Sequence, residues 1–147
     1  MDWRWRSWEE LGRDELYALV VLRQRVFVVE QRCAYLDADG RDPGAVHLTG
    51  WQGGRLVAYL RAFAPGDDGA ARIGRVVTAP EVRGSGLGRP LMREGIAGAL
   101  ARWGPAPIAL SAQAHLAAFY GSLGFDVTGE PYDEDGIPHV AMIRTGG

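Results

Sequence analysis

Residues 80–92 read Pro-Glu-Val-Arg-Gly-Ser-Gly-Leu-Gly-Arg-Pro-Leu-Met. Gly84, Gly86 and Gly88 alternate with other residues between Arg83 and Arg89, where an apolar strand pattern stops and a helical pattern starts. Because glycine has no Cβ, the backbone here can turn sharply and approach a ligand closely, and the unpaired amides of a helix start can point at anionic oxygens. The stretch therefore predicts a strand, a loop and a helix that together hold a polyphosphate.

The length and composition of the chain indicate how many domains it forms and where it is located. The chain has 147 residues, of which 47% are hydrophobic, which fits one domain spanning residues 1–147. No apolar run approaches the roughly 18 residues that a membrane span needs. The start, Met-Asp-Trp-Arg-Trp-Arg, lacks the apolar centre of a secretory signal. We therefore expect a cytoplasmic protein that does not bind a membrane.

The charges exclude several classes of function. A formal net charge of −2 argues against a general nucleic-acid binder, which needs a concentrated positive surface. All 16 basic residues are arginine, so the chain has no lysine for a Schiff base or for a Walker loop. ATP or GTP hydrolysis of the P-loop kind is thereby excluded.

Hydrophobic periodicity and turn residues predict an α/β fold. Strands are expected at residues 3–6, 47–52, 55–64, 71–78, 108–112, 125–131 and 137–144, and helices at 14–29, 87–103 and 113–123. We expect a mixed, mostly antiparallel sheet of roughly six or seven strands, flanked by about four helices.

A dinucleotide-binding turn is the nearest rival for the glycine loop. That turn requires Gly-x-Gly-x-x-Gly and an acidic residue about 20 positions later. After Gly84 and Gly86 the third position holds Arg89, and residues 103–107 are Trp-Gly-Pro-Ala-Pro. The nicotinamide interpretation therefore fails, while a merely tight strand-to-helix connection remains an alternative.

A second motif follows at residues 113–125, Gln-Ala-His-Leu-Ala-Ala-Phe-Tyr-Gly-Ser-Leu-Gly-Phe. Together with Arg83-x-x-Gly86-x-Gly88 after residues 76–78, this pattern resembles the Gcn5-related N-acetyltransferase (GNAT) family. Further segments are similar to the ElaA-like subfamily: 26–31, 35–40, His47, 112–115 and 134–139. The resemblance covers nearly the whole chain and implies a GNAT-like α/β fold.

The resemblance implies acetyl-CoA as the donor. Loop amides and a helix dipole suit a pyrophosphate, and a strand with a free edge can pair with the amides of pantetheine. The implied donor-binding residues are Val76, Val77, Thr78, Arg83, Gly84, Ser85, Gly86, Leu87, Gly88, Arg89, Gln113 and Phe119.

Two residues are the first candidates for proton transfer. Tyr120 can protonate the leaving thiolate, because a phenol is protonated at neutral pH. Without the motif it would be a half-buried aromatic with its hydroxyl on a backbone group. Glu30 ends an apolar stretch and is the first candidate for the base, with a simple ion pair to an arginine as the alternative. Asp37, Asp39, Glu134 and Asp135 are further candidates for the base, and His47 or His139 could relay the proton. The candidate acceptor-binding residues are Asp37, Asp39, His47, Glu134 and His139.

Metal binding is not expected. The acidic turn that starts at Asp37 has its glycine at the wrong position for a calcium loop and Leu48 where a bidentate glutamate is required. The spacing of His47, His115 and His139 does not demand a metal either.

The sequence thus predicts an N-acetyltransferase. It would move an acetyl group from acetyl-CoA to a primary amine by direct attack in a ternary complex. The acidic loops favour a small cationic acceptor, while an amino acid or a peptide amine remains open. The alternative is a catalytically silent acyl-CoA-binding or sensing domain. Either a monomer or a homodimer is compatible with the sequence.

Overall fold

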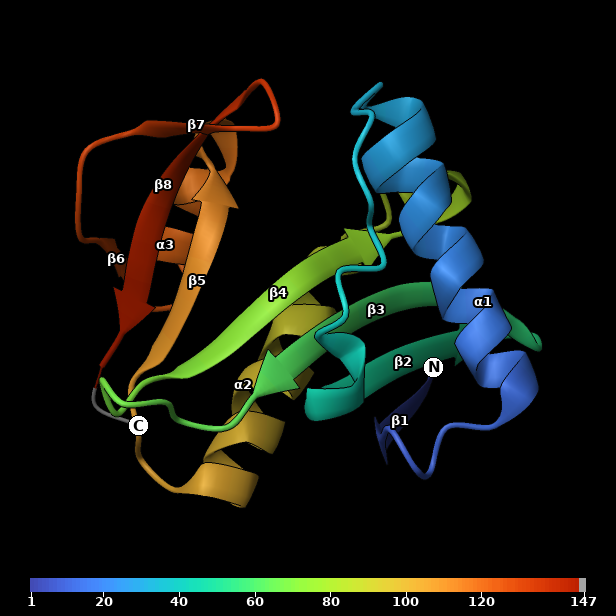
Figure 1. The fold of residues 1–147 in the computed structure, drawn as a ribbon. Coiled ribbons are helices and arrows are strands. Elements are labelled where there is room, and N and C mark those ends of the chain that lie inside the picture. Colours follow the sequence, from blue (N-terminus) through green and yellow to red (C-terminus); the bar gives the residue numbers. More distant parts are fainter. Residues whose placement is uncertain (146–147) are drawn as a thin grey trace.

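The computed structural model describes residues 1–145 and contains one mixed sheet. Its strands are β1 (Asp2–Ser7), β2 (Val46–Gln52), β3 (Arg55–Phe63), β4 (Ala71–Thr78), β5 (Ile108–Gln113), β6 (Phe125–Val127), β7 (Tyr132–Glu134) and β8 (Ile137–Arg144). The strand order is β1-β2-β3-β4-β5-β8-β6, with β7 paired to β8 (Figure 1). Strands β4 and β5 pair in parallel and the other pairs are antiparallel, which confirms the predicted class of sheet.

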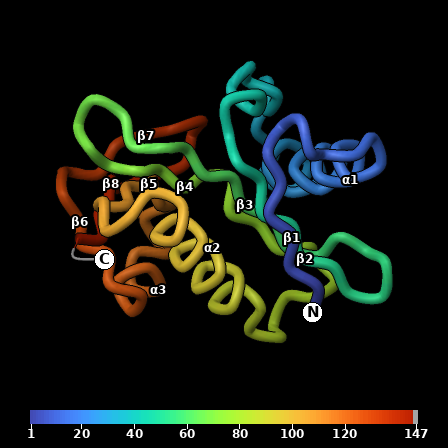
Figure 2. Tube along the Cα trace, turned by 90° about the horizontal axis from the view of Figure 1, so that it is seen from below, coloured from blue at the N-terminus to red at the C-terminus, as the bar shows by residue number. Residues whose placement is uncertain are grey.

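Helices cover both faces of this sheet (Figure 2). The helices are α1 (Arg13–Arg23), which continues as a π-helical segment over Gln24–Glu30, α2 (Gly88–Trp103) and α3 (Ala117–Gly121). Short 3₁₀ turns lie at Asp42–Gly44, Pro80–Val82 and Ala114–Leu116.

Strand β3 lies between two hydrophobic clusters because successive side chains of a strand point to opposite faces. Tyr59 packs in the cluster that contains Leu19 of α1. Leu60 packs in the cluster that contains Leu91 of α2. All four of these residues are fully buried. The sheet is therefore anchored from both sides next to β4.

The number and bounds of the elements differ from the predictions in several places. The strand expected at 125–131 ends at Val127, and the helix expected at 14–29 is α-helical only to Arg23. The sheet has eight strands. The additional strand, β7, was not predicted, because its exposed residues show no apolar alternation. The predicted helix at 113–123 is shorter, since Gln113 ends β5 by pairing with His139 and α3 begins only at Ala117. Within residues 1–145 there are three α-helices, and the π and 3₁₀ segments make up the remaining helical turns.

Strands β4 and β5 diverge soon after they meet (Figure 1). They pair only at Ala71 with Ile108 and at Arg72 with Ala109. On the other side of β4, the register with β3 shifts between Tyr59 and Arg61, and Arg75 has a positive φ of 52°. A bulge of this kind bends the strand. Among residues 1–145, no strand pairs with the β4 edge beyond Arg72 on the side of β5.

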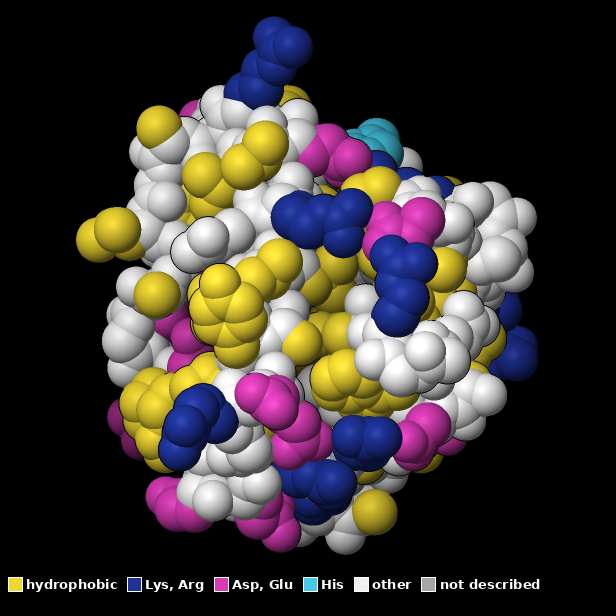
Figure 3. Space-filling view, turned by 90° about the vertical axis from the view of Figure 1, so that its right-hand side faces the viewer, with side chains coloured by type: hydrophobic (Ala, Val, Ile, Leu, Met, Phe, Trp, Pro, Cys, Tyr) yellow, Lys and Arg dark blue, Asp and Glu magenta, His cyan; other side chains and the backbone are white. Residues whose placement is uncertain are grey.

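Basic and acidic side chains are intermixed on the surface over α1 (Figure 3). This arrangement agrees with the near-balance of 16 basic and 18 acidic residues in the chain. Within residues 1–145, no helix combines the length and the apolar character that crossing a bilayer requires.

Candidate active site

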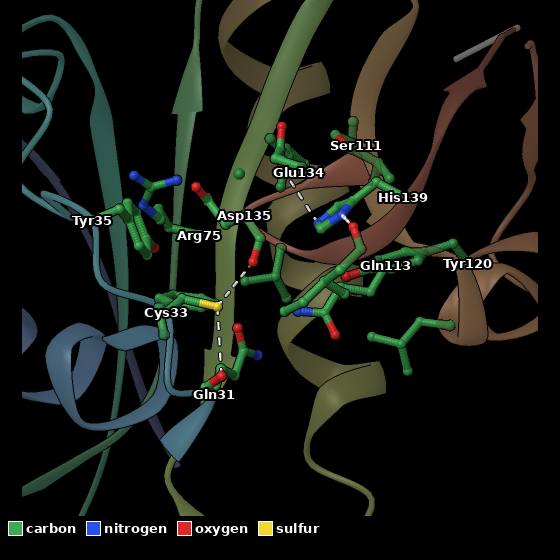
Figure 4. A pocket seen from close by; sticks show the side chains of 17 residues that line it. Gln31, Cys33, Tyr35, Arg75, Ser111, Gln113, Tyr120, Glu134, Asp135 and His139 are labelled. Atoms are coloured by element: carbon green, nitrogen blue, oxygen red, sulfur yellow. Dashed lines mark hydrogen bonds and ion pairs between the residues drawn. The ribbon is translucent and has the colours of Figure 1, made fainter. Parts of the chain in front are cut away.

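A cavity of about 130 Å³ lies where β4 and β5 separate (Figure 4). Its walls come from β4, β5, the helical stretch after β5, the segment after α1 and the hairpin of β7 and β8. The lining residues are Phe27, Gln31, Cys33, Tyr35, Ile73, Gly74, Arg75, Val76, Leu110, Ser111, Gln113, Leu116, Tyr120, Glu134, Asp135, Ile137 and His139. Because β4 and β5 diverge, a gap forms between them, and segments that are far apart in the sequence line this gap.

Tyr120 lies on one side of this cavity, with Cys33 and Tyr35 on the other (Figure 4). Its side chain packs edge-on against Phe119 and Phe125 and is only 7% exposed. Within residues 1–145 its hydroxyl has no hydrogen-bond partner, and burial raises the pKa of Tyr120 to about 12. A protonated, unpartnered hydroxyl therefore lines the cavity, where a sulfur could receive its proton.

The glycine loop has the shape that the sequence predicts. Gly84 and Gly86 have φ angles of 87° and 79°, which residues with a Cβ rarely adopt. Among the described residues, the amides of Gly84, Gly86 and Leu87 have no hydrogen-bond acceptor. The start of α2 adds the amides of its first turn, whose dipole favours an anion. The loop can therefore hold a pyrophosphate.

The predicted donor-binding arginines flank this loop. The guanidinium of Arg89 lies 5.5 Å from the ring centre of Phe119, which connects the loop to α3. The guanidinium of Arg83 lies 2.6 Å from a carboxylate oxygen of Glu30. Both arginines lie beyond the C-terminal end of β4. A ligand bound there could extend along the free edge of β4 and reach the cavity.

Glu30 occupies a position that fits the ion-pair alternative. Its hydrogen bond with Arg83 lowers the pKa of Glu30 below its usual range. Its side chain is 41% exposed and does not line the cavity, although the next residue, Gln31, does. This placement does not favour the predicted role of Glu30 as the base.

Asp37 and His47 belong to a buried network of polar and charged side chains, and Asp39 is an exposed member of it. None of the three lines the cavity. Arg23 contacts carboxylate oxygens of both Asp37 and Asp42 at 2.8 Å. His47 is fully buried between the hydroxyl of Tyr59 at 2.6 Å and the carbonyl of Asp42 at 2.9 Å, and burial lowers its pKa. A direct contact of these three predicted residues with an acceptor in the cavity is therefore not supported.

The network nevertheless supports one cavity wall. Arg75, at the bulge of β4, donates to the carboxylate of Asp37 at 2.9 Å, and its guanidinium lies 5.6 Å from the ring of Tyr35. Asp39 pairs with Arg61 at 2.6 Å and lies 3.6 Å from Arg75. Asp37 and Asp39 thus fix residues that face the cavity.

Glu134 and His139 do line the cavity, as predicted for the acceptor site. The hairpin of β7 and β8 presents both residues, and a carboxylate oxygen of Glu134 lies 3.3 Å from Nε2 of His139. Asp135 lines the cavity next to them. Among residues 1–145, neither Glu134 nor Asp135 is within ion-pair distance of an arginine.

Cys33 and Tyr35 were not among the predicted site residues. The thiol of Cys33 lies 3.3 Å from the carbonyl oxygen of Asp135, a contact that spans 102 residues of sequence. Burial raises the pKa of Tyr35 to about 12. Only the tertiary fold brings these segments together, so no local pattern could have indicated them.

A second cavity of about 510 Å³ adjoins the first. Both are lined by Ile73, Gly74, Arg75, Leu110, Ser111 and Glu134. In residues 1–145, no three His, Cys, Asp or Glu side chains gather in a way that would hold a metal ion.

Comparisons with known proteins agree with this geometry. A family model described as an acetyltransferase (GNAT) domain matches residues 25–145. Protein ElaA of Escherichia coli (strain K12) is 43% identical over 147 residues, covering 98% of this chain and 96% of that protein. The crystal structure of an acyl-CoA N-acyltransferase from Pseudomonas aeruginosa matches with a TM-score of 0.94 and 46% identity, covering 98% of this chain and 99% of that chain. The crystal structure of Escherichia coli ElaA matches with a TM-score of 0.92 and 42% identity, covering 97% and 98%. These matches confirm the resemblance seen in the sequence.

Proposed function

Because the chain belongs to the GNAT family of acetyltransferases and is ElaA-like, we propose that it transfers the acetyl group of acetyl-CoA to a primary amine. The fold of this family binds acyl-CoA and supports acyl transfer from it. The observation that carries the proposal is the free edge of β4, which leads from the glycine loop to the cavity that contains the Tyr120 hydroxyl.

The donor would lie along this edge. The amides of residues 84–89, together with Arg83 and Arg89, would hold the pyrophosphate by charge-assisted hydrogen bonds. Residues 76–78 would pair with the amides of pantetheine as with another strand. Gln113 and Phe119 would lie beside the thiol arm. The free loop amides and the unpaired edge support this fit.

Acetyl-CoA supplies a thioester whose carbonyl carbon can be attacked by a neutral amine. The residues around it would handle charge and protons. A backbone N–H near Val77, next to the bulge at Arg75, would donate to the carbonyl oxygen as negative charge develops there. Tyr120 would protonate the sulfur as the C–N bond forms and the C–S bond breaks. Its raised pKa keeps the phenol protonated at neutral pH.

The proposed acceptor is a small cationic amine. Glu134 and Asp135 bring two carboxylates to the cavity, and neither has an arginine partner among the described residues. Such carboxylates attract an ammonium ion and so raise its local concentration. The modest size of the cavity fits a small molecule better than a folded protein surface.

A screen for release of the CoA thiol tests this function. Acetyl-CoA would be offered with polyamines, aminoglycosides, amino acids and short peptides, and the acetylated product would be identified by mass spectrometry. We expect thiol release only with an amine present, in equal amount to the amide formed. If CoA raises the melting temperature but no amine class supports thiol release, the sensing-domain alternative replaces the enzyme.

A further inference from the structure

His139 and Glu134 are predicted from the sequence to bind the acceptor, and their contact in the cavity also suits them to a part in proton transfer, with Nε2 of His139 3.3 Å from a carboxylate oxygen of Glu134. Resting on the function proposed above, we propose that Nε2 of His139 takes the proton that the acceptor ammonium must lose before it can attack. Glu134 would stabilise the imidazolium that results.

The hydrogen bonds of His139 fix the nitrogen that is basic. Nδ1 lies 2.7 Å from the carbonyl oxygen of Ile137, and because a carbonyl only accepts, Nδ1 must carry the hydrogen. Nε2 is then the free basic nitrogen, and it lies 3.3 Å from a carboxylate oxygen of Glu134. A lone pair facing a carboxylate is unfavourable, whereas a proton on Nε2 completes an ion pair. The geometry therefore leaves Nε2 as the ring nitrogen that can accept a proton, with a carboxylate beside it.

The packing holds the imidazole in this orientation. His139 is 8% exposed, and its ring stacks on Tyr132, with ring centres 6.2 Å apart and planes inclined by 27°. Strand β8 fixes its backbone opposite Gln113 of β5. The Glu134 side chain is 52% exposed, so a proton shared by the pair can pass to bulk water.

The other titratable or charged side chains of the cavity are less suited to this step. They are Cys33, Tyr35, Arg75, Tyr120 and Asp135. Burial keeps both tyrosines protonated, with pKa values of about 12. The guanidinium of Arg75 is bound to Asp37, and the Cys33 thiol donates to the carbonyl of Asp135. Asp135 is the remaining competitor because its carboxylate lacks an arginine partner in residues 1–145.

The proton count requires one such acceptor. The ammonium first gives a proton to Nε2 and becomes a neutral amine. The amine nitrogen then bonds to the carbonyl carbon, and the bond between that carbon and the sulfur breaks. Tyr120 donates its proton to the leaving sulfur. The nitrogen loses its second proton to Tyr120, which is thereby reprotonated. The products are an amide, a CoA thiol and one proton, which the His139 and Glu134 pair releases to water.

Comparing the activity of each variant with two nucleophiles distinguishes a residue that acts as a base from one that only supports the structure. Propylamine is almost entirely an ammonium ion at pH 7 and needs the base, whereas hydroxylamine is largely uncharged and does not. The variant His139→Asn keeps an N–H donor for Ile137 but removes Nε2. The variant Glu134→Gln removes the charge of the partner, and Asp135→Asn tests the competitor. Glu130→Gln, an exposed carboxylate outside the cavity, is the matched control.

With acetyl-CoA at pH 7, we expect His139→Asn to lower the turnover of propylamine at least about tenfold and that of hydroxylamine less than about twofold. Glu134→Gln should show the same selectivity in kcat with a smaller loss. Asp135→Asn should raise the KM for propylamine, because one attracting carboxylate is lost, but should leave its kcat within about twofold, and Glu130→Gln should change neither quantity. Equal losses with both nucleophiles, no loss in His139→Asn, or a selective loss of kcat in Asp135→Asn alone would overturn the inference. If the unaltered protein releases no CoA thiol with either nucleophile, the proposed function fails and the inference falls with it. A retained thermal shift with CoA confirms that each variant still folds and binds the donor.

Discussion

Tyr120 is the residue on which acetyl transfer depends most directly. Its buried hydroxyl lines the cavity and has no partner within residues 1–145, and a pKa of about 12 keeps it protonated at neutral pH. We expect Tyr120→Phe to keep the affinity for acetyl-CoA and to lower kcat at least about tenfold. Steady-state kinetics and the thermal shift with CoA measure the two quantities. Full activity in this variant would remove Tyr120 from the mechanism.

Glu30 is expected to matter little for proton transfer. Its pKa is lowered by the hydrogen bond with Arg83, so the carboxylate is ionised on both sides of neutrality and does not titrate there. We expect Glu30→Gln to leave the pH dependence of kcat unshifted between about pH 6 and 9. The KM for acetyl-CoA should stay the same or fall, because Arg83 becomes free for the pyrophosphate. If Glu30→Gln instead abolishes the fall of kcat at low pH, Glu30 is the base after all.

At the scale of elements, the glycine loop gives the clearest prediction. An alanine at position 86 must adopt a φ near 79°, which costs about 1 kcal/mol and tilts the loop amides away from a phosphate. We expect Gly86→Ala to raise the dissociation constant of CoA at least about fivefold. Gly53→Ala is the control, since Gly53 has a φ of 55° in the turn between β2 and β3, away from the loop. Equal affinity in both variants would argue against the loop as the pyrophosphate site.

The elements that the sequence predicted well are those with a strong local pattern. The strand, glycine loop and helix order around residues 71–103 is confirmed, as are the strands expected at 47–52 and 55–64. Strand β7 was not predicted because its residues are exposed and only its pairing with β8 defines it. The divergence of β4 and β5 could not be predicted from the sequence either, because it depends on pairing between strands that are distant in sequence.

At the scale of the whole molecule, the buried charges hold the cavity wall in place. Burial of Asp42 opposes its ionisation, but hydrogen bonds from Arg23 and Arg61 outweigh this effect and lower its pKa. We expect Arg23→Met to lower the free energy of unfolding by about 3 kcal/mol, because it leaves two buried carboxylates with one arginine each. Urea unfolding measures this loss. The control Arg72→Met breaks an exposed pair with Asp68 and should cost little. Similar losses in the two variants would contradict a structural role for the network.

The network also explains why the candidate site was only partly predicted. From sequence, the acids and histidines near the subfamily segments are equivalent candidates. The fold separates them: His47 and Asp37 are buried in ion pairs and hydrogen bonds, whereas Glu134 and His139 reach the cavity. The difference depends on which arginines lie nearby in space, and spacing along the chain does not encode that.

We propose that the glycine loop and the free edge of β4 bind acetyl-CoA and that the adjoining cavity between β4 and β5 is where its acetyl group is transferred. Amine-dependent release of the CoA thiol, measured across acetyl-CoA concentrations for the unaltered protein, Tyr120→Phe and Gly86→Ala, tests it most directly. We predict a lower kcat with an unchanged KM in Tyr120→Phe, and a higher KM with a largely retained kcat in Gly86→Ala. Thiol release that both substitutions leave unchanged, or no amine-dependent release by the unaltered protein, would contradict the claim.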